Sequence, residues 1–528
     1  MRTVRWRLAA RVSGLLGLVT ATAAGQSAPF VWADSTPTDC PFPRSTHIEP
    51  GVGFTGRHVE LPDSDADTWY PSWAADGALY SPFADGAVNG VAVDGYHDTA
   101  QQRTGNARIT GDDPMHLKLE VISTVKNDPT PYAGRYPSAS LVYNGVWYYG
   151  TYTLDDQYGP CQNWCVQGPF IGFRQSTDGG NTWKDTTHKP DSPLFGETGK
   201  NGSKVKFGAI HMVDFGKNME RSPDGRAYFV SNGPSSSSGL VDWIAGDAVY
   251  LGRVTPTPEN MDNNAAFEFF SGDPGADAWS KNVADAKPIA LWPGKLGNVS
   301  VTYDAPLHIY LMWVSRPHDP GKNMGNFDTM LFESSQLTGP WNIVTTWSNF
   351  GPQAYFVNTP SKFIGADGKT MWLLYSANYT HIDGLPEGSK YNFGLHEFTF
   401  DSSLIPDAGV ITGNPSAGGA GGTGATAGAG NAAGAGIISG AGNTAGAGTT
   451  AGAAGATAGA GTTAGGALNA GAGAPMAGAA PVSHGSDGCG CHQVGASSGV
   501  GRAPGALVLA LTFTPLLSRF RRRRRARA

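Results

Sequence analysis

Two aspartates lie near opposite ends of the stretch DTWYPSWAADGALYSPFADG, residues 67–86. Asp67 opens the stretch, Asp85 lies near its end, and an Asp-Gly pair between them is typical of a tight turn. Two strands joined by a tight turn are neighbours, so we expect the two carboxylates on the same rim. Hydrolysis of a glycosidic bond needs one carboxylic acid to protonate the leaving oxygen and a second carboxylate to attack or to activate water. The spacing predicts such a pair; the alternative is that both groups are strand-end caps or solvated charges.

The distance between two such carboxyl groups decides the stereochemical outcome. Roughly 5–5.5 Å favours retention and about 6.5–9.5 Å favours inversion. Trp69, Tyr70 and Trp73 accompany Asp67, and aromatic faces stack on the apolar faces of sugars. This composition suits a carbohydrate better than an apolar ligand.

The hairpin is the first of five similar segments, each an apolar strand, a turn and a second strand rich in Tyr and Trp. The segments are YPSWAADGALYSPF, SASLVYNGVWYYGTYTL, MERSPDGRAYFVSNG, VSVTYDAPLHIYLMWVS and SKFIGADGKTMWLLYSANY. Four turn on Asp-Gly or Asn-Gly, which predicts two-residue hairpins with positive φ at both central residues. The turns recur about every 60 to 80 residues, enough for one four-stranded blade each. The pattern predicts an all-β, five-bladed β-propeller; a β-sandwich is the competing fold.

In such a propeller the residues that open each first strand face a central funnel. Glu220 opens the third segment and is a third candidate catalytic acid; the alternative is an ion pair with Arg221 or Lys217. The other residues expected to bind substrate at this mouth are Trp69, Tyr70, Trp73, Arg135, Tyr136, Asp214, Lys217, Asn218, Asn298, Tyr355 and Asn358.

The two ends of the chain differ from this core in composition. Residues 1–26 combine arginines, the apolar run LLGLV and the small residues ATAAG, as a secretory signal peptide does. The predicted catalytic propeller spans residues 39–404. Residues 408–486 are mostly Gly, Ala, Thr and Ser, which predicts a disordered linker. The formal net charge of −6 does not suggest a nucleic-acid partner, and we expect a monomer.

Residues 487–528 hold DGCGCHQ, then GALVLALTFTPLLS, then RFRRRRRARA. The apolar part is too short for a comfortable membrane span. This order resembles the C-terminal sorting tag of myxobacterial surface proteins (MYXO-CTERM). The resemblance implies export, processing or lipidation near Cys489 or Cys491, and retention at the outer cell surface.

Two cysteines inside the core, Cys161 and Cys165 in YGPCQNWC, predict a small loop disulfide in an oxidising compartment. Asp94, His97 and Asp98 crowd one loop, but their spacing matches no known metal site, so we assign no metal. The expected chemistry requires no cofactor and leaves room for a structural calcium ion.

Two short motifs resemble those of known propellers. STDGGNTW, residues 176–183, matches the Asp-box pattern S-x-D-x-G-x-T-W, whose role is structural in the families that carry it. ESSQLTGPW, residues 333–341, resembles an outer-strand motif of furanosidase-type five-bladed glycosidases.

The stretch around Asp67 resembles the first blade of the propeller family, formerly a domain of unknown function, that includes endo-D-arabinanases. In that family the acids matching Asp67 and Asp85 are the catalytic pair. Here Ala84 replaces the usual Gly and Gly86 the usual Thr, so the resemblance implies a polysaccharide hydrolase without naming the sugar.

The sequence thus predicts a secreted, surface-anchored glycoside hydrolase that uses two carboxylates. A polysaccharide lyase is one alternative: it would use Tyr136, Tyr355 and His211 for proton transfer, with Arg135 and Lys217 neutralising a uronate. A non-catalytic carbohydrate-binding or adhesion propeller is the other, and the linker and tag would suit it.

Overall fold

The computed structural model describes residues 23–49, 52–93, 103–126, 135–154, 167–198, 204–235, 242–319, 326–350, 354–377 and 390–413. The predicted disulfide at Cys161 and Cys165, the linker, and the tag with Cys489 and Cys491 lie outside these residues. Among the helices that are described, none is long and apolar enough to cross a membrane.

The described strands form five sheets. The first comprises β4 (Ser64–Asp67), β5 (Ser72–Trp73), β6 (Leu79–Val88), β7 (Val91–Val93), β8 (Arg103–Thr110) and β9 (Lys118–Lys126). The second comprises β10 (Arg135–Tyr143), β11 (Val146–Thr153) and β12 (Phe173–Ser176). The third comprises β13 (Ile210–Met212), β14 (Ala227–Gly233), β15 (Gly246–Val254), β16 (Glu268–Phe270), β17 (Trp279–Ser280) and β18 (Pro288–Leu296).

The fourth sheet comprises β19 (Asn298–Asp304), β20 (Ile309–Pro317), β21 (Phe327–Ser334) and β22 (Asn342–Trp347). The fifth comprises β23 (Tyr355–Asn358), β24 (Thr370–Ser376), β25 (Gly394–Thr399), β3 (Gly53–Glu60), β2 (Phe30–Trp32), β26 (Gly409–Ile411) and β1 (Ala23–Gln26). Short 3₁₀ turns connect some strands: η1 (Pro114–His116), η3 (Lys217–Met219), η4 (Asn260–Asp262), η5 (Asn264–Ala266), η6 (Val283–Asp285), η7 (Ser361–Phe363) and η8 (Ser402–Leu404).

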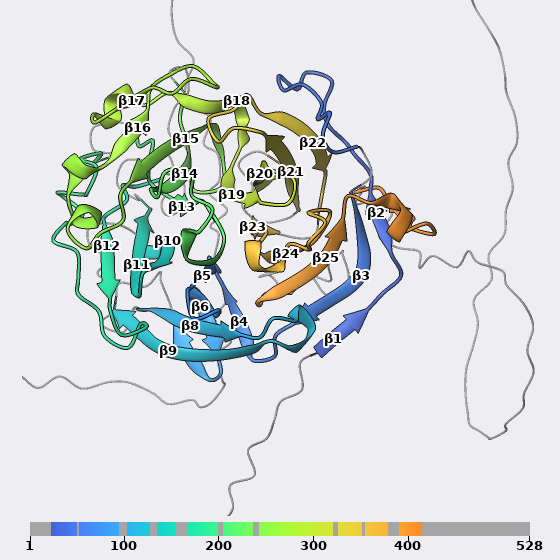
Figure 1. The fold of residues 1–528 in the computed structure, drawn as a ribbon, viewed down its shortest axis with the longest axis horizontal. Helices are drawn as coiled ribbons and strands as arrows, with labels where there is room; N and C mark the ends of the chain where they lie inside the picture. Colours follow the sequence, from blue (N-terminus) through green and yellow to red (C-terminus); the bar gives the residue numbers. More distant parts are fainter. Residues whose placement is uncertain are drawn as a thin grey trace, which may run out of the picture. The chain divides into compact units, whose positions relative to one another are not determined.

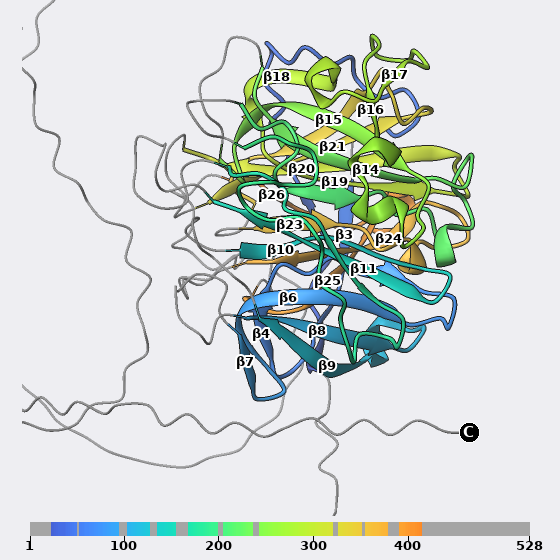
Figure 2. The same ribbon diagram turned by 90° about the vertical axis from the view of Figure 1, so that its left-hand side faces the viewer.

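The sheets are arranged radially around a common centre, as in a β-propeller (Figure 1). β10, β13, β19 and β23 lie innermost, and each sheet continues outwards from its inner strand. Figure 2 shows the same sheets from the side, stacked one above another. The all-β, propeller-like architecture expected from the sequence is confirmed.

Both ends of the described chain contribute to the fifth sheet. β3 pairs with β25, β2 pairs with β3, and the late strand β26 runs parallel to β2. β1 adds to β3 with Ala23 opposite Glu60. The ordered fold therefore reaches beyond the predicted limits of residues 39–404 on both sides, and it includes residues assigned to the signal peptide. The strands concerned are only three or four residues long, too short for a reliable periodicity signal.

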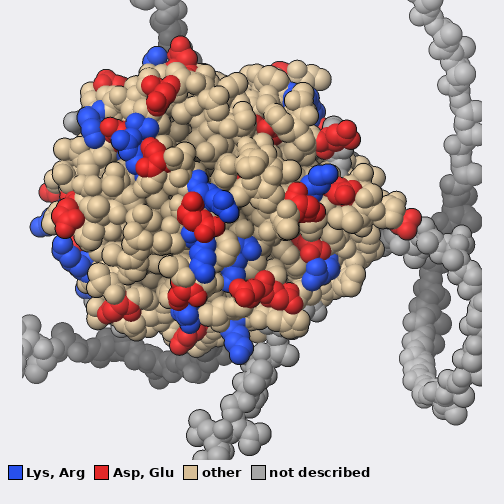
Figure 3. Space-filling model, viewed as in Figure 1, with Lys and Arg blue, Asp and Glu red and all other residues tan. Residues whose placement is uncertain are grey.

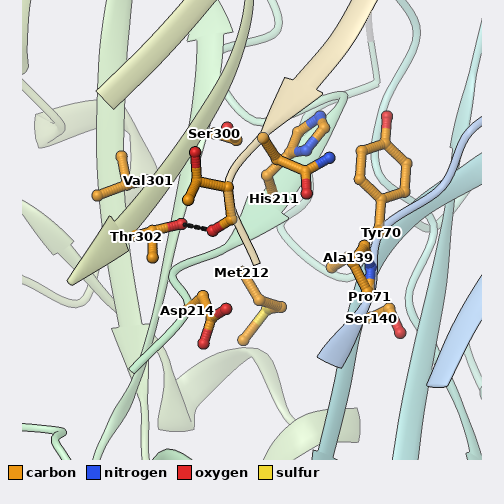
Figure 4. Close-up of a pocket in the computed structure, with 12 residues that line it drawn as sticks. Tyr70, Pro71, Ala139, Ser140, His211, Met212, Asp214, Ser300, Val301 and Thr302 are labelled. Carbon is orange, nitrogen blue, oxygen red and sulfur yellow. Dashed lines mark hydrogen bonds between the residues drawn. The ribbon is translucent and has the colours of Figure 1, made fainter. Parts of the chain in front are cut away.

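Hydroxyl groups on the inner strands join neighbouring sheets at the centre. Ser300 Oγ donates to the carbonyl oxygen of Val357, and Thr302 Oγ1 donates to that of Thr359, both at 2.7 Å. Figure 4 shows the Thr302 contact beside the axial cavity. Small polar side chains near the axis therefore satisfy backbone groups that adjacent sheets would otherwise leave unpaired.

Aromatic side chains fill the space between sheets further out. Phe195 packs on Phe229 at 5.7 Å between ring centroids and edge-on against Phe267 at 5.1 Å, and all three are buried. Full burial of a side chain of this size contributes about 1.5–3 kcal/mol. This packing holds the radial sheets in fixed relative positions.

The predicted turns prove to be of two kinds. Asn144 and Gly145 have φ of 48° and 79° and join β10 directly to β11, so the two-residue hairpin is confirmed there. At Gly77, Gly225 and Gly368 φ is positive, but the preceding aspartates are not left-handed. The prediction is wrong at these sites because the connections are longer: β13 ends at Met212, and β14 begins only at Ala227.

Residues 176–183 form a tight turn on an outer strand. Asp178 accepts hydrogen bonds from the Ser176 hydroxyl at 2.8 Å and the Thr182 amide at 2.9 Å. These donors, the Thr182 side chain foremost, lower the pKa of Asp178 to about 2. The Trp183 ring packs edge-on against Trp147 at 5.2 Å. All of these contacts are internal to the fold, and none reaches the centre of the sheets.

Acidic and basic side chains are interspersed on the face of the molecule drawn in Figure 3. Ion pairs on the third sheet, such as Arg253 with Glu268 at 2.8 Å, are of this mixed kind. No field of a single sign covers this face, so it provides no electrostatic footprint for a polyanion.

Candidate active site

Asp67 ends β4 and is enclosed by hydroxyl groups. Its pairing with β6 shifts register between Asp65 and Asp67, and such a bulge re-aims side chains. The Asp67 side chain and backbone are only 7% exposed. Tyr355 donates to Oδ2 at 2.6 Å and Thr68 donates to Oδ1 at 3.2 Å. A carboxyl group from the first sheet is thus held by a tyrosine from the fifth.

Burial raises the pKa of Asp67 to about 7. Hydrogen bonds from Tyr355, Tyr391 and Thr68 oppose this shift because they stabilise the charged form. No cation contributes. Near neutral pH, Asp67 can therefore either carry a proton or release one, as a general acid must.

Asp85 lies beside Asp67 in the same sheet, because Asp67 is opposite Ala84. The Asp85 backbone carbonyl accepts a hydrogen bond from the Tyr391 hydroxyl at 2.7 Å. Both carboxylates raise the pKa values of Tyr391 and Tyr152, behind the larger effect of burial. The structure therefore brings the two predicted aspartates to the same pair of phenol groups.

Unusual backbone conformations cluster at this place. Thr68, Asp85 and Phe356 have positive φ values of 59°, 52° and 55°. For a β-branched residue such as Thr68 this is a genuine outlier, and such strain persists only where the surroundings enforce it. A second register shift falls between Tyr355 and Asn358 in β23. Both strands that supply the Asp67–Tyr355 contact are thus irregular at the contact.

An aromatic wall surrounds the two aspartates. Tyr136 stacks on Tyr152 at 5.4 Å, and Tyr152 stacks on Trp243 at 6.4 Å. Of these, only Tyr136 was expected at the site; Tyr152, Trp243 and Tyr391 were not singled out. They lie at the end of a second strand or in loops between strands, and only the expectation that such loops return to the funnel could have indicated them.

Below this wall lies the axis of the sheets. Tyr70 and His211 meet edge to face, with ring centroids 4.3 Å apart, and Nε2 of His211 lies 3.4 Å from Nδ2 of Asn298. Burial lowers the pKa of His211 to about 3, so its imidazole is neutral. A cavity of about 40 Å³ begins here and ends at Asp214 (Figure 4). That volume suits a few water molecules, and the cavity does not include Asp67.

Asp214 lies at the far end of the cavity and has a different set of partners. Its carboxylate accepts bonds from the Ser361 amide at 2.7 Å, the Ser361 hydroxyl at 2.6 Å and the Gly216 amide at 3.0 Å. Its backbone bridges to Thr302 of the fourth sheet. Asp214 thus ties the third sheet to the fourth and fifth, away from Asp67.

Trp69 and Trp73 were predicted to stack on a sugar, and the structure shows both packed within the fold. Trp69 is 1% exposed, donates from Nε1 to the Ala66 carbonyl at 2.9 Å and stacks on Phe83. The prediction that it faces the funnel is wrong: the chain leaves β4 after Asp67 through Thr68, whose φ is 59°, and Trp69 is buried in the core. Trp73 lies on β5 and lines a second cavity together with Met219, on the Asp214 side.

The structure does not bring Asp67 together with Glu220, Lys217 and Asn218. They follow β13 in the connection to β14, whereas the prediction placed them at the start of the first strand of their blade; that placement is wrong. Asn218 exchanges hydrogen bonds with Asn144 at the hairpin turn of the second sheet. The Glu220 side chain is 52% exposed and lies 3.6 Å from Arg221. The apolar strand that precedes it, around Ile210, is so short that the sequence suggested a later start.

The other predicted binding residues lie on or beside the first strands of their sheets: Tyr136 on β10, Asn298 at the start of β19, Tyr355 and Asn358 at the two ends of β23, and Tyr70 between β4 and β5. Tyr70 and Asn358 line the axial cavity. Asn358 donates to the Trp69 carbonyl at 3.3 Å and so links the first and fifth sheets. Arg135 begins β10 opposite Thr153; its side chain lies outside the described part. Asp94, His97 and Asp98 also lie outside it. Within the residues described, no group of acids, histidines or cysteines could hold a metal ion.

The comparison with known proteins finds matches among solved structures. No family model and no curated protein matches the chain. Among solved structures, a candidate hydrolase from Bacteroides ovatus aligns with TM-score 0.39 and 13% identity over 67% of this chain and 93% of its own. An α-L-arabinofuranosidase from Podospora anserina, solved with cellotriose, aligns with TM-score 0.35 and 11% identity over 72% and 98%. A GH43 endo-arabinanase from Bacillus licheniformis aligns with TM-score 0.34 and 12% identity over 65% and 98%.

Proposed function

We propose that the protein is a glycoside hydrolase that cleaves a polysaccharide with Asp67 as general acid and Asp85 as the second carboxylate. One observation carries the proposal: a buried carboxyl group with a pKa of about 7 lies beside a second aspartate and among tyrosine hydroxyls. A general acid works best when its pKa lies near the working pH.

In this mechanism Asp67 protonates the glycosidic oxygen as the bond to the anomeric carbon breaks. Asp85 either attacks that carbon or removes a proton from a water that attacks it directly. In the first case a second step follows, in which the Asp67 carboxylate takes a proton from water and this water releases the sugar from Asp85. Tyr355 donates to the Asp67 carboxylate that results and holds it for reprotonation, with Tyr391 beside it. The strained backbone at Thr68 and Asp85 supports the proposal, since such strain concentrates at functional sites.

Arg135 and Lys217 are the cations that a lyase would use to neutralise a uronate. Lys217 lies instead beside the turn at Gly77, and the Arg135 side chain is outside the described residues. The hydrolase is proposed on the two carboxylates, and a polysaccharide panel decides between the two reactions.

The remaining features of the proposal rest on the sequence. We propose that the five sheets are five blades, that the protein is exported by its signal peptide, and that the C-terminal tag retains it at the cell surface. Residues 176–183 would be an Asp-box. The enzyme would act as a monomer, with polysaccharide as its partner and no cofactor, and a structural calcium ion is compatible with this picture.

A panel of neutral and uronate polysaccharides tests the proposal. Reducing ends should appear without absorbance near 235 nm, and Asp67→Asn and Asp85→Asn should each abolish their release. Absorbance near 235 nm would instead indicate elimination, hence a lyase.

The low exposure of Asp67, 7%, favours one second candidate, a carbohydrate-binding propeller without catalysis. That candidate predicts binding with no product, unchanged by either substitution.

A further inference from the structure

Trp243 lies between aromatic side chains from two other sheets. It precedes β15, in the connection from β14. Its ring stacks on Tyr152 of β11, is tilted by 31° against Phe356 at 5.4 Å, and meets Tyr355 of β23 edge to face at 5.7 Å. Trp243 is half-buried, and neighbours from two sheets pack against its ring, so the indole is placed to brace them.

The residues around Trp243 hold it in place. Asp242 accepts hydrogen bonds from the amides of Ile244 and Ala245, and Asn232 Nδ2 donates to the Asp242 carbonyl at 3.1 Å. Such a local turn fixes the backbone on both sides of the indole. The third sheet thus holds the Trp243 ring in a fixed position against the second and fifth sheets.

The two tyrosines that Trp243 contacts are those that border Asp67. Tyr355 donates to the Asp67 carboxylate at 2.6 Å. Burial raises the pKa of Tyr152, and the charge of Asp67 adds to this effect. Tyr355 and Tyr152 are each 2% exposed. Truncation of the indole would leave a void beside both rings, and water or rotated rings would then fill it.

We propose that Trp243 is a positioning residue for Asp67: it braces Tyr355 and Tyr152 so that water stays away from the Asp67 carboxyl group. The effect of burial on the pKa of Asp67 would then depend in part on the packing of this indole. The inference rests on the proposed function only in giving this acid a catalytic role.

Other groups also face Asp67 and must be separated from this effect. Tyr355, Tyr391 and Thr68 donate to its carboxylate, and Asp85 lies beside it in the sheet. Burial, and with it the charge of Asp67, also raises the pKa of Tyr70, whose ring packs edge to face with the neutral His211. On Trp243's own turn, Asp242 has a pKa of about 7, raised by burial. A test must therefore isolate the protons bound by Asp67.

The test measures the free energy of unfolding of the full chain between pH 4.5 and 7.5, with and without Asp67→Asn. The difference between the two curves isolates the contribution of Asp67. We expect Trp243→Ala to reduce this Asp67-dependent change by about twofold or more, because a better-hydrated carboxyl group has a lower pKa. Trp243→Phe should restore most of it. If the alanine variant does not fold, Trp243→Leu takes its place.

Trp279→Ala is the matched control, since Trp279 is a partly buried indole in the same sheet that packs on Arg253 at 3.8 Å. It should lower stability at every pH and leave the Asp67-dependent change intact. An unaltered Asp67-dependent change in the Trp243 variants would overturn the inference.

The catalytic arm uses any polysaccharide that the wild-type chain cleaves. Trp243→Ala should move the alkaline limb of the pH–rate profile to lower pH and reduce kcat more than it raises KM. An Asp67→Asn variant that keeps full activity would refute the proposed function, whereas the unfolding measurement would still decide the role of Trp243.

Discussion

The carboxyl groups of Asp67 and Asp214 both lie inside this propeller-like fold, and burial raises the pKa of both. Their partners differ. Asp214 accepts bonds from two backbone amides and a serine, whereas the donors to Asp67 are side-chain hydroxyls. Backbone amides are part of the fold itself, but a hydroxyl hydrogen can turn to another acceptor while its ring stays in place. Burial alone therefore does not mark a functional acid, and the kind of donor separates the two.

The backbone is unusual near both aspartates. Thr68, Asp85 and Phe356 adopt positive φ next to the Asp67 contacts. Asn218 and Met219 do so on the Asp214 side. Asp214 also joins two sheets through a β-bridge to Thr302. Backbone conformation therefore does not separate the two acids, and the difference between them lies in the groups that donate hydrogen bonds.

The strongest test of this comparison is to replace each of the two acids in turn. Asp67→Asn keeps the shape and removes the transferable proton, so kcat/KM should fall about 10²- to 10⁴-fold. Asp214→Asn should stay within about threefold of wild type, since it touches no reacting group. Rates of reducing-end release on a cleaved polysaccharide measure both. Equal losses of kcat/KM in the two variants would show that Asp67 and Asp214 do not differ in function.

We expect the free energy of unfolding to fall more when Asp214 is replaced than when Asp67 is replaced. Asp214→Ala leaves the amides of Ser361 and Gly216 without an acceptor, at a cost of about 2–3 kcal/mol in the free energy of unfolding. Asp67→Asn should not destabilise the protein at pH 7.5, where the wild-type chain buries a charge. Denaturant titration measures both values. A chain weakened more by Asp67→Asn than by Asp214→Ala would contradict the assignment of Asp214 as the structural acid.

The pH dependence of stability sharpens the comparison further. The folded-state pKa of Asp67, about 7, lies above its ordinary value of 3.8, so the folded state holds the proton more tightly. Its contribution is fully present below pH 4 and is lost as the pH rises to about 7, by up to about 4 kcal/mol. Asp67→Asn should remove this fall. Unfolding curves at half-unit pH steps test this prediction. If the free energy of unfolding of the Asn variant depends on pH as that of the wild type does, the pKa of Asp67 is not raised in the folded state.

The smallest expected effect concerns one phenol. The Tyr355 hydroxyl lowers the pKa of Asp67, so Tyr355→Phe should raise that pKa and move the alkaline limb of the pH–rate profile to higher pH. The loss of kcat/KM at the optimum should be about three- to tenfold, the usual value of one hydrogen bond. Glu220→Gln is the control, because this exposed side chain should leave the profile unchanged.

Much of the architecture could be predicted because it is encoded locally. Alternating apolar residues and turn pairs predict strands from a few neighbours, and Asn144-Gly145 behaves as its residue types require. The pairing of Asp67 with Asp85 was also visible, since both belong to one hairpin. The start of β13 was missed because three strand residues carry too little periodicity, and Glu220 was consequently placed at the wrong end of its blade.

The sequence by itself determined the all-β class of the fold and the hairpin turn at Asn144-Gly145, because these depend on residues close together in the chain. It also placed Asp67 and Asp85 on neighbouring strands, β4 and β6. Only the tertiary structure decided which acid is enclosed. Tyr355 lies 288 residues from Asp67 in the chain, and Trp243 acts from a third sheet. The removal of water from a carboxyl group depends on every group packed around it, and no local pattern records that.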